Sequence, residues 1–368
     1  MTPRVLEIVE TVGLGGAETQ NLQIFRALAQ QPLSPVLHVM ALQAGPLEKE
    51  YREGPFTFEL FHGSSAWSPQ SFWHFRQRVE AFRPHLIHTH GFKALVYTAL
   101  STWGLRTPLL FSWHGYRALD TRRDMQWTVR VLHHRFRYAI AVSEAVAQLL
   151  HRKAGVPLHK IRVFPNAIDL APYRHLSPAY ERATPPEGRL IVGMVGRLAE
   201  VKNYPLFLQI VAHLAREFPH LEAWIVGDGP LRPHLEQLAE QWGIAPRVRF
   251  WGFRRDIPEL LTQMDLFVFT SHAESFGLVV VEAQAAGLPV VVSDYPAAAS
   301  LIQEGRTGFL ARRGQLEDFL HKARALLASP ERRRQMGRAA RAWAFQAFSL
   351  DTYVKRLLNL YRDLTTAR

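Results

Sequence analysis

Short apolar runs alternate with longer amphipathic segments along the first half of the chain. Apolar residues recur at helical spacing between residues 19 and 29, and similar segments separate the runs that follow. The runs predict buried strands at residues 5–9, 36–42, 56–61, 86–88, 109–112 and 139–142. A strand, a helix and another strand in that order form the βαβ unit of a parallel sheet. The first half is therefore predicted to be an α/β domain.

The second half repeats this alternation. A strand is predicted at residues 190–195 and a helix from about residue 204 to residue 217. Two further strands are predicted at residues 265–270 and 289–293, with a helix between them that Gly277 opens and Gly287 closes. The three valines at residues 279–281 favour a strand by propensity, but the closing glycine and the strand that follows favour a helix. The chain is thus predicted to contain two doubly wound parallel sheets.

The length of 368 residues is too great for one ordinary core and suits two domains. Residues 1–170 are predicted to form the N-terminal domain. Residues 171–188 are polar and contain prolines, so they are predicted to be a linker. Residues 189–345 would form the C-terminal domain, and residues 346–368 a terminal amphipathic helix.

Composition is that of a globular protein, with 48% hydrophobic and 21% charged residues. No stretch approaches the roughly 18 consecutive apolar residues of a membrane span, and the first residues lead directly into a strand. A cytoplasmic location is expected. The absence of cysteine excludes disulfide bonds and thiolate chemistry.

The net charge of +12 is concentrated in the first half. Residues 1–175 contain 20 Lys and Arg against 12 Asp and Glu, a surplus of eight. Such a surplus favours an anionic partner, whether a membrane surface, a phosphorylated glycan, a nucleotide or a nucleic acid.

Two carboxylates, Glu274 and Glu282, flank the start of the helix that Gly277 opens. A carboxylate beside an apolar helix is costly unless hydroxyl or amide donors meet it, and sugar hydroxyls are such donors. The free amides around Phe276 and Gly277 can bind an anion, and Gly277 permits close approach of a phosphate. Together these features predict a sugar nucleotide site. The alternative is a helix N-terminus that merely favours an acidic neighbour.

Arg197 follows the strand at residues 190–195, and Lys202 precedes the next helix. The two cations and a helix N-terminus would therefore converge on one point, which predicts a diphosphate site.

A glycine-rich turn at residues 13–18 follows the first strand. Glu18 stands where a dinucleotide-binding loop needs its third glycine, so an NAD site is disfavoured. The backbone amides of Gly15 and Gly16 can still contact a phosphate.

Histidines end two predicted strands in the first half. His88 and His90 form a His-x-His pair, but a metal would need two more ligands and no clear carboxylate partner is expected nearby, so no metal is expected. These strand ends are expected to face the ligand cleft. His114, in a His-Gly context after the next strand, is the stronger candidate, although it could also be a hydrogen-bonded residue that stiffens a loop.

Residues 120–138 show two helical stripes. Met125, Val129, Leu132 and Phe136 form an apolar stripe that is predicted to be core. The other stripe consists of Trp127, Arg130, His134 and Arg137. An aromatic residue among cations is typical of a helix at an anionic membrane interface, but also occurs on a solvated face of a basic protein.

Several of these motifs together resemble the retaining glycosyltransferases of family four, which have the GT-B architecture. The Glu-x7-Glu arrangement of Glu274 and Glu282, followed by Ala-Ala-Gly-Leu-Pro-Val-Val, is the most specific of them. The segments at residues 13–18, 163–169, 196–202 and 227–230 also resemble family motifs, although Ala167 stands where glycine is usual. The resemblance implies two Rossmann-like domains that face each other across a cleft, with the terminal helix crossing back to the first domain.

The resemblance also implies roles for individual residues. Those given a catalytic role are Glu274, His114, Arg197 and Lys202. Those expected to bind the donor are Gly15, Gly16, Arg197, Lys202, Phe253, Glu274, Phe276, Gly277, Leu278 and Glu282. Those expected on the acceptor or membrane side are Trp113, Tyr116, Arg117, Arg122, Arg123, Trp127 and Arg130.

The implied activity is retaining transfer of a hexose from a nucleotide diphosphate sugar, with a preference for UDP, to an acceptor hydroxyl. A lipid-linked or cell-envelope glycan is the expected acceptor, and peripheral contact with an anionic membrane is expected. No cofactor or metal is implied, since the departing phosphate itself can take the acceptor proton. Sugar nucleotide epimerases and hydrolases share the fold and remain alternatives, as does a nucleic-acid-binding protein, for which no aromatic and basic interleaving is seen.

Overall fold

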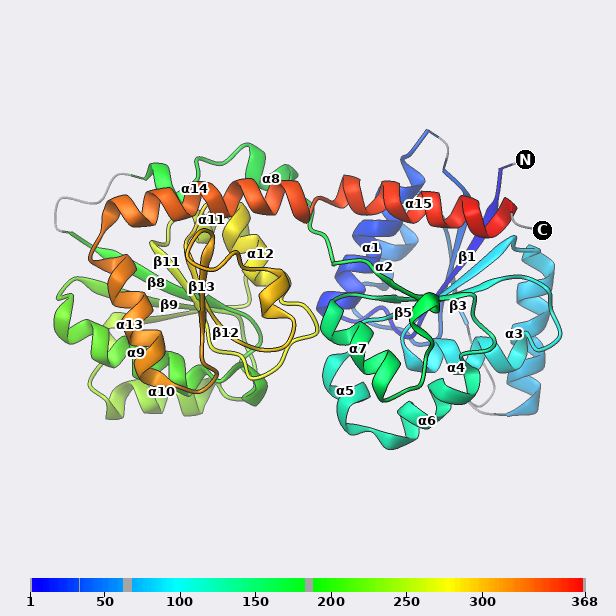
Figure 1. Cartoon of the computed structure of the whole chain (residues 1–368), viewed down its shortest axis with the longest axis horizontal. Coiled ribbons are helices and arrows are strands. Elements are labelled where there is room, and N and C mark those ends of the chain that lie inside the picture. The colour runs from blue at the N-terminus through cyan, green and yellow to red at the C-terminus, as the bar shows by residue number, and fades with distance from the viewer. Residues whose placement is uncertain (1, 33, 62–67, 183–187, 367–368) are drawn as a thin grey trace. The chain divides into compact units, whose positions relative to one another are not determined.

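The computed structural model describes residues 2–32, 34–61, 68–182 and 188–366, without the side chain of Arg117. The chain forms two compact units, which are described separately here (Figure 1). The first unit comprises Met1–Ala167 and Leu350–Arg368, and the second comprises Ile168–Ser349. Residues 183–187 of the expected linker lie outside the described residues.

The first unit contains a seven-stranded parallel sheet. Its order is β3-β2-β1-β4-β5-β6-β7. The strands are β1 (Arg4–Val9), β2 (Val36–Ala41), β3 (Thr57–Leu60), β4 (Leu86–His90), β5 (Leu109–Trp113), β6 (Tyr138–Ala141) and β7 (Ile161–Val163). The helices are α1 (Gly16–Ala29), α2 (Glu48–Arg52), α3 (Pro69–Phe82), α4 (Phe92–Ser101), α5 (Tyr116–Thr121), α6 (Arg123–Leu132), α7 (Glu144–Arg152) and α15 (Leu350–Thr366).

The second unit contains a six-stranded parallel sheet. Its order is β10-β9-β8-β11-β12-β13. The strands are β8 (Leu190–Val195), β9 (Leu221–Val226), β10 (Val248–Gly252), β11 (Leu266–Phe269), β12 (Val290–Ser293) and β13 (Gly308–Ala311). The helices are α8 (Ala171–Arg174), α9 (Tyr204–Glu217), α10 (Arg232–Gln241), α11 (Ile257–Thr262), α12 (Leu278–Ala285), α13 (Leu316–Leu327) and α14 (Pro330–Ala347).

These two sheets confirm the predicted fold class. In each sheet the first strand lies in the interior and the order reverses beside it, which is the doubly wound arrangement. Every residue of β8 and of β11 is buried, as expected for strands covered on both faces. The carboxyl ends of neighbouring strands therefore meet along one edge of each sheet, and the predicted site residues follow those ends.

The C-terminal helix α15 packs into the core of the first unit (red in Figure 1). It lies against α1 and β4, and its buried apolar residues join the same core as Val5 and Phe25. Its Tyr361 reaches the middle of the sheet, where its hydroxyl donates a hydrogen bond to Glu7. This helix completes the first unit from the other end of the chain.

Part of the expected linker makes hydrogen bonds within the second unit. The Tyr173 carbonyl accepts a hydrogen bond of 2.6 Å from Arg341, and the Ala179 amide donates one of 2.9 Å to the Ala286 carbonyl. These bonds tie residues 173–179 to α14 and to the end of α12.

The helix that was predicted within residues 120–138 is shorter than its stripes suggested. Helix α6 ends at Leu132, and Tyr138 begins β6. Val129 and Leu132 are buried as predicted, and Phe136 is buried beyond the helix with its ring 5.4 Å from that of Phe111. Among the described residues, no helix combines the length and the apolar content that crossing a membrane requires.

Candidate functional site

The predicted residues of the second unit gather at the carboxyl ends of β8 and β11. Lys202 ends a short 3-10 turn, Glu200–Lys202, after β8, and Glu274 lies in the loop after β11. The Lys202 ammonium is 2.6 Å from the Glu274 carboxylate, and both side chains retain nearly a fifth of their exposure. The pair joins a cation predicted to bind diphosphate to a carboxylate predicted to bind sugar, although 72 residues separate them.

Hydrogen bonds between the two loops hold this pair together. The Thr270 hydroxyl donates to the carbonyls of Lys202 and Asn203, at 3.0 and 2.9 Å. The His272 amide donates to the Val201 carbonyl at 2.8 Å. Ser271 contacts both the Val201 carbonyl, at 3.0 Å, and the Glu274 carboxylate, at 2.7 Å. The loop after β11 therefore cannot move without disturbing the loop after β8.

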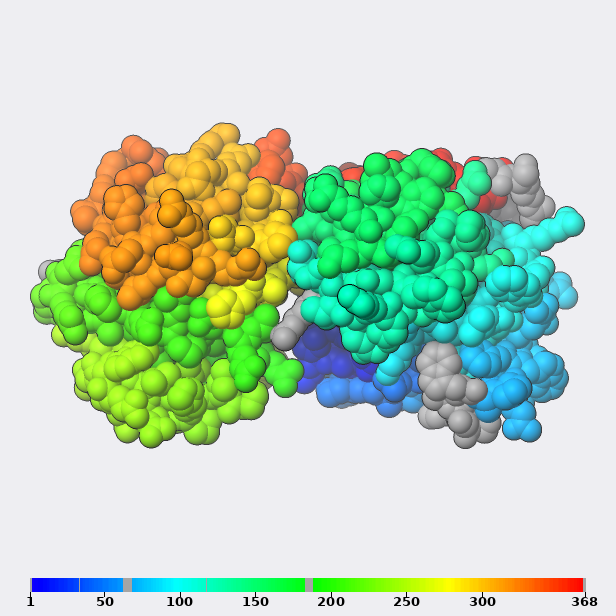
Figure 2. All heavy atoms as spheres, turned by 60° about the horizontal axis from the view of Figure 1, so that its bottom comes forward, coloured from blue at the N-terminus to red at the C-terminus, as the bar shows by residue number. Residues whose placement is uncertain are grey.

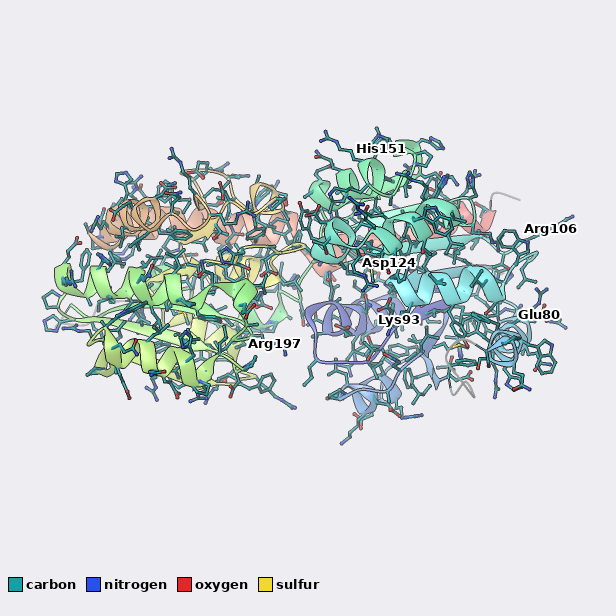
Figure 3. All side chains as sticks on the ribbon, turned by 90° about the horizontal axis from the view of Figure 1, so that it is seen from below. Glu80, Lys93, Arg106, Asp124, His151 and Arg197 are labelled. Carbon is teal, nitrogen blue, oxygen red and sulfur yellow. The ribbon has the colours of Figure 1, made fainter. Side chains whose placement is uncertain are left out.

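Arg197 lies at the surface of the second unit, directly after β8 (Figure 3). Its guanidinium makes no hydrogen bond or ion pair among the described residues. The methylenes of Lys202 lie beside Gly196, the residue that precedes Arg197. An exposed cation without an internal partner next to a second cation can bind an anion without first breaking a protein contact.

Helix α12 begins as predicted. Its N-cap is Gly277, with a φ of 105°, a conformation that other residues adopt only with strain. A Cβ at Gly277 would also clash with the hydroxyl of Tyr295, which donates a 3.0 Å hydrogen bond to the Phe276 carbonyl. Gly287, with a φ of 83°, follows the end of the helix. The first amides of α12, including that of Leu278, lack partners within the helix and can face an anion.

Glu282 lies in the second turn of α12, and its carboxylate makes no hydrogen bond or ion pair with the residues that the structure describes. Burial raises the pKa of its carboxyl to about 7. A carboxylate that is partly desolvated and has no internal donor is suited to accept hydrogen bonds from ligand hydroxyls.

Phe253 follows β10 and leaves 65% of its surface exposed. Its neighbour Arg254 forms an ion pair of 2.5 Å with Asp256 and lies 5.3 Å from the Trp251 ring. An exposed aromatic ring at a strand end offers a surface on which a planar base could stack.

In the first unit, the glycine-rich turn borders a cavity of about 290 Å³. Gly15 is the N-cap of α1, whose first residue is Gly16. A Cβ at Gly15 would clash with the Glu18 carboxylate, which also lines the cavity. Other lining residues are Glu10, Asn21, His90, Phe92, Trp113 and His114.

His114 is placed on this cavity, as its predicted role requires. Its Nε2 lies 3.4 Å from Nδ1 of His90, while its own Nδ1 is buried without a partner among the described residues. Burial, with a smaller effect of His90 and His88, lowers the pKa of His114 to about 3. His114 is therefore neutral at physiological pH.

The sequence-based argument about His88 and His90 was wrong in two respects. His88 is fully buried instead of facing a ligand, with Nδ1 2.6 Å from the Tyr361 hydroxyl and Nε2 2.7 Å from the Ser112 hydroxyl. A carboxylate partner is also present, because β1 lies beside β4 and pairs Glu7 with His88 in register. The ligand atoms of Glu7, His88 and His90 lie within 4.8 Å of one another. Glu7 and His88 are far apart in the sequence, and the pairing of β1 with β4 brings them into contact.

The acceptor-side residues separate into different environments. Trp113 is buried beside the cavity, and its indole nitrogen donates to the Gly115 carbonyl, so it cannot contact a membrane. Tyr116 begins α5 and is half-buried. The side chain of Arg117 lies outside the described residues.

The remaining acceptor-side residues are exposed on α6 or next to it. This helix lies at the surface of the first unit (teal in Figure 2). Arg122 forms an ion pair with Asp124 at 2.5 Å, and Arg130 donates to the Lys153 carbonyl at 3.1 Å. Arg123 lies on the same helix. Trp127 leaves 67% of its surface exposed.

Two further residues that line the cavity, Glu10 and Asn21, were not predicted from the sequence. Glu10 accepts a hydrogen bond from the Lys93 amide at the start of α4, and burial raises the pKa of its carboxyl. Asn21, on α1, is 4% exposed and its Oδ1 has no partner among the described residues. Neither residue belongs to a recognisable motif, so only the sheet order brings them together.

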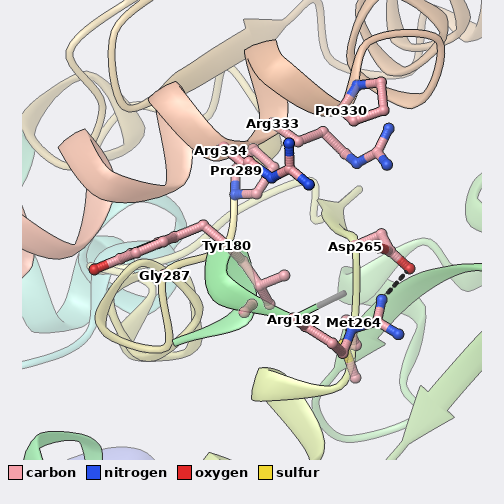
Figure 4. Close-up of a pocket in the computed structure, with 11 residues that line it drawn as sticks. Tyr180, Arg182, Met264, Asp265, Gly287, Pro289, Pro330, Arg333 and Arg334 are labelled. Atoms are coloured by element: carbon pink, nitrogen blue, oxygen red, sulfur yellow. Dashed lines mark ion pairs between the residues drawn. The ribbon is translucent and has the colours of Figure 1, made fainter. Parts of the chain in front are cut away.

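A second cavity, of about 20 Å³, lies elsewhere in the second unit (Figure 4). It is lined by Asp265 and Pro289, which precede β11 and β12, and by Arg182, which pairs with Asp265 at 2.5 Å. Its position at the amino ends of the strands is opposite to the edge that carries Glu274, and its volume suits about one water molecule.

Comparison with known proteins agrees with this arrangement. The model of the Glycosyl transferases group 1 family matches residues 179–343, and that of Glycosyltransferase Family 4 matches residues 14–172. A D-inositol 3-phosphate glycosyltransferase of Nocardia farcinica is 31% identical over 351 residues, which cover 92% of this chain and 73% of that protein. The chain belongs to the group 1 glycosyltransferases. It is therefore an enzyme that transfers a hexosyl group from an activated nucleotide sugar.

A further relative and a solved structure are also similar to this chain. The putative glycosyltransferase EpsF of Bacillus subtilis is 26% identical over 307 residues, which cover 79% of each chain. The crystal structure of Anabaena HepE in complex with UDP and glucose has a TM-score of 0.85 and 24% identity, and covers 98% of this chain and 100% of that one. This likeness shows the GT-B fold. Nothing in these comparisons supports the epimerase, hydrolase or nucleic-acid-binding alternatives.

Proposed function

We propose that this glycosyltransferase is a retaining, metal-independent enzyme that moves a hexose from a UDP-sugar to an acceptor hydroxyl. Its proposed donor site comprises the second-unit residues around the Lys202 and Glu274 pair. The observation that carries this proposal is that pair, because it joins a phosphate-binding cation to a sugar-binding carboxylate at 2.6 Å.

Each residue of the proposed donor site then has its own role in binding or in catalysis. Arg197 and Lys202 bind the diphosphate and stabilise it as leaving group, helped by the amides of α12. Glu274 with Phe276, Gly277 and Leu278 positions the sugar, while Glu282 accepts from the ribose. Phe253 stacks on the base. The departing phosphate takes the acceptor proton, so the protein needs no general base.

The preference for UDP is supported by the ligands of HepE, which was crystallised in complex with UDP, with UDP and glucose, and with UDP-glucose. A thermal-shift panel of UDP, GDP and ADP sugars tests it. A nucleotide present at a hundred times its Kd stabilises the folded state by about 2.7 kcal/mol. Stabilisation by a GDP or ADP sugar instead would contradict the UDP assignment.

Retention and metal independence are tested with the selected donor. Proton NMR of the first product formed should show the same anomeric configuration as the donor, and turnover should survive EDTA. Release of free sugar from the donor alone at the full rate would favour a hydrolase, and loss of turnover in EDTA that Mg²⁺ or Mn²⁺ restores would contradict the metal-free mechanism.

The acceptor is proposed to be a lipid-linked or cell-envelope glycan at a cytoplasmic membrane surface. Trp127 and the basic residues on α6 support this proposal, since an exposed indole among cations suits an anionic interface. The relatives act on varied acceptors by name, among them D-inositol 3-phosphate and L-malate. The class of acceptor is therefore best established by assay with extracted lipid-linked glycans.

A further inference from the structure

A single carboxylate lies at the centre of the first sheet. Glu7, on β1, is fully buried, and three side chains surround it. The Tyr361 hydroxyl is 2.6 Å from its Oε1, while Nε2 of His90 is 2.9 Å and Nδ1 of His88 is 3.2 Å from its Oε2. Burial would raise the pKa of Glu7, but the attraction of His88 and the hydrogen bonds from His88 and His90 outweigh it and lower the pKa to about 2.

The ionised carboxylate determines where its neighbours carry their protons. A carboxylate only accepts hydrogen bonds, so Tyr361 and Nε2 of His90 must both donate to it. Because the Tyr361 hydroxyl proton points to Glu7, this hydroxyl can only accept from His88. Nδ1 of His88 must therefore donate to it. Nε2 of His88 accepts from the Ser112 hydroxyl at 2.7 Å. In this arrangement the hydrogen bonds among Glu7, Tyr361, His88 and Ser112 each have one donor and one acceptor.

The ionised Glu7 carboxylate also determines where His90, and through it His114, carry their protons. Burial is the largest cause that lowers the pKa of His90, to about 4, so this residue is neutral and its Nδ1 holds a lone pair. Nε2 of His114, 3.4 Å away, must therefore donate. Because His114 is also neutral, its Nδ1 holds the remaining lone pair. That atom is buried without a partner in the part of the chain that the structure describes, on a residue that lines the cavity.

We propose that Glu7 is a positioning residue that acts through His90 to hold His114 as a hydrogen-bond acceptor toward a sugar hydroxyl bound in this cavity. The inference rests on the proposed function, which supplies the sugar. The carboxylates of Glu10 and Glu18 also line the cavity and are acceptors. The hydroxyl belongs either to the sugar being transferred or to the acceptor, and the experiment below separates these sources.

A different reading of the cluster is a metal site formed by Glu7, His88 and His90. It would require the nitrogens of both histidines to exchange their present hydrogen bonds for a metal. Elemental analysis of the purified full-length protein tests this directly. Stoichiometric zinc or iron would overturn the proposal, whereas metal-free protein supports it.

The tautomer of His114 can be measured in the free protein. Full-length protein labelled with 15N-histidine gives long-range imidazole correlations, and the His114→Asn variant identifies the signals that belong to His114. We expect the proton of His114 on Nε2 in the wild-type protein. In E7Q, whose amide can donate to His90, we expect the Nδ1–H tautomer of His114 to appear. Ser112→Ala, which removes the partner of His88 only, is the matched control and should leave His114 unchanged.

Two results would overturn the proposal here: a wild-type proton on Nδ1 of His114, or the same His114 tautomer in E7Q as in wild type. The wild-type measurement needs no variant, so it stands even if E7Q does not fold. The tautomer measurement also needs no nucleotide sugar. It can therefore contradict the role of Glu7 while the proposed glycosyl transfer stands, and glycosyl transfer can be disproved while the tautomer is as expected.

Ligand additions then identify the hydroxyl. A shift of the His114 Nδ1 resonance with UDP-glucose but not with UDP assigns it to the transferred sugar, whereas a shift with myo-inositol or methyl glucoside assigns it to the acceptor. No shift with any of them, in a protein that UDP-glucose stabilises thermally, would overturn the contact. In turnover, E7Q should lower kcat/KM roughly tenfold, as expected for one lost hydrogen bond, and S112A should not.

Discussion

The Lys202 ammonium lies 2.6 Å from the Glu274 carboxylate and 5.0 Å from the centre of the Phe269 ring. A lysine with two such contacts is oriented before any ligand arrives, whereas exposed Arg197 must be ordered by the ligand itself. The two cations therefore contribute differently. In the proposed diphosphate site, Lys202 would supply a fixed charge, and Arg197 a charge that the bound diphosphate orders.

Removing either cation should weaken donor binding. A charge-assisted hydrogen bond contributes about 1.5–3 kcal/mol, so Arg197→Ala and Lys202→Ala should each raise the Kd for the nucleotide sugar roughly ten- to a hundredfold. Titration calorimetry measures this. Arg216→Ala is the matched control, because Arg216 is an exposed arginine at the far end of α9. Equal weakening by the control, or none by either variant, would contradict the diphosphate assignment.

Glu282 should make donor binding depend on pH. Its folded-state pKa is raised from 4.5 to about 7 by burial, so the carboxyl is largely protonated below pH 7. The ionised form is the better acceptor for ribose hydroxyls, and affinity for a UDP-sugar should therefore rise as pH increases through 7. The diphosphate of a sugar nucleotide does not titrate in this range. Glu282→Gln should flatten the profile, and an unchanged profile in that variant would refute the role.

The raised pKa of Glu282 has the opposite consequence for stability. The folded state holds this proton more tightly than the unfolded state, so the stabilising contribution of the protonated carboxyl is present below about pH 4.5 and is lost as pH rises toward 7. A functional carboxyl that costs stability at the working pH is typical of a binding site.

At the level of elements, the site depends on turns that only glycine allows. Gly227 ends β9 with a φ of 128°, and a Cβ there would clash with the Gly196 carbonyl. The Leu198 amide donates to the Asp228 carbonyl at 3.0 Å, which fastens the two turns together. The turn after β9, at Gly227 and Asp228, therefore fixes the conformation of the loop that carries Arg197.

Gly277→Ala should impair both folding and donor binding. Its φ of 105° costs a residue with a side chain about 1–2 kcal/mol, and the added Cβ would clash with the Tyr295 hydroxyl. Denaturant unfolding should show that loss, and donor Kd should rise. The double variant Gly277→Ala with Tyr295→Phe removes the clash but keeps the strained backbone, so it should recover only part of the stability. Full wild-type stability in the single variant would show that α12 begins differently.

The elements themselves were largely predictable from sequence. The strand at residues 190–195 and the helix at residues 204–217 were predicted with the boundaries that β8 and α9 have. A continuous apolar run and a regular amphipathic stripe are strong local signals. The α6 region was predicted less well, because Phe136 continues the apolar stripe although it is buried by packing on Phe111 outside the helix.

The proximity of Lys202 and Glu274 in the second unit was predictable, because both residues belong to local motifs after strands. The Glu7 cluster was not, since β1, β4 and α15 bring together residues as far apart as Glu7 and Tyr361. Strand pairing and helix docking create such contacts, and no local pattern reports them. Trp113, predicted on the acceptor or membrane side, lines the cavity, and its indole is buried and bonded to Gly115. Membrane contact by Trp113 is therefore excluded, whereas its acceptor-side role stays a prediction.

For the whole molecule, the net charge of +12 favours anionic surfaces. Binding to vesicles tests the proposed membrane contact. Flotation should recover more protein with anionic than with zwitterionic vesicles and less at high salt, since exposed charges are screened. Trp127→Ala should lower recovery, whereas Trp73→Ala, on α3 and also exposed, is the matched control. Equal recovery on both vesicle types would contradict the contact.

The most direct test of the donor site is a crystal structure of the complex with the nucleotide sugar that the panel selects. We expect the diphosphate within hydrogen-bond distance of Arg197, Lys202 and the first amides of α12, with sugar hydroxyls at Glu274 and ribose hydroxyls at Glu282. A nucleotide bound elsewhere, with the Lys202 and Glu274 pair left in contact with solvent, would contradict the assignment.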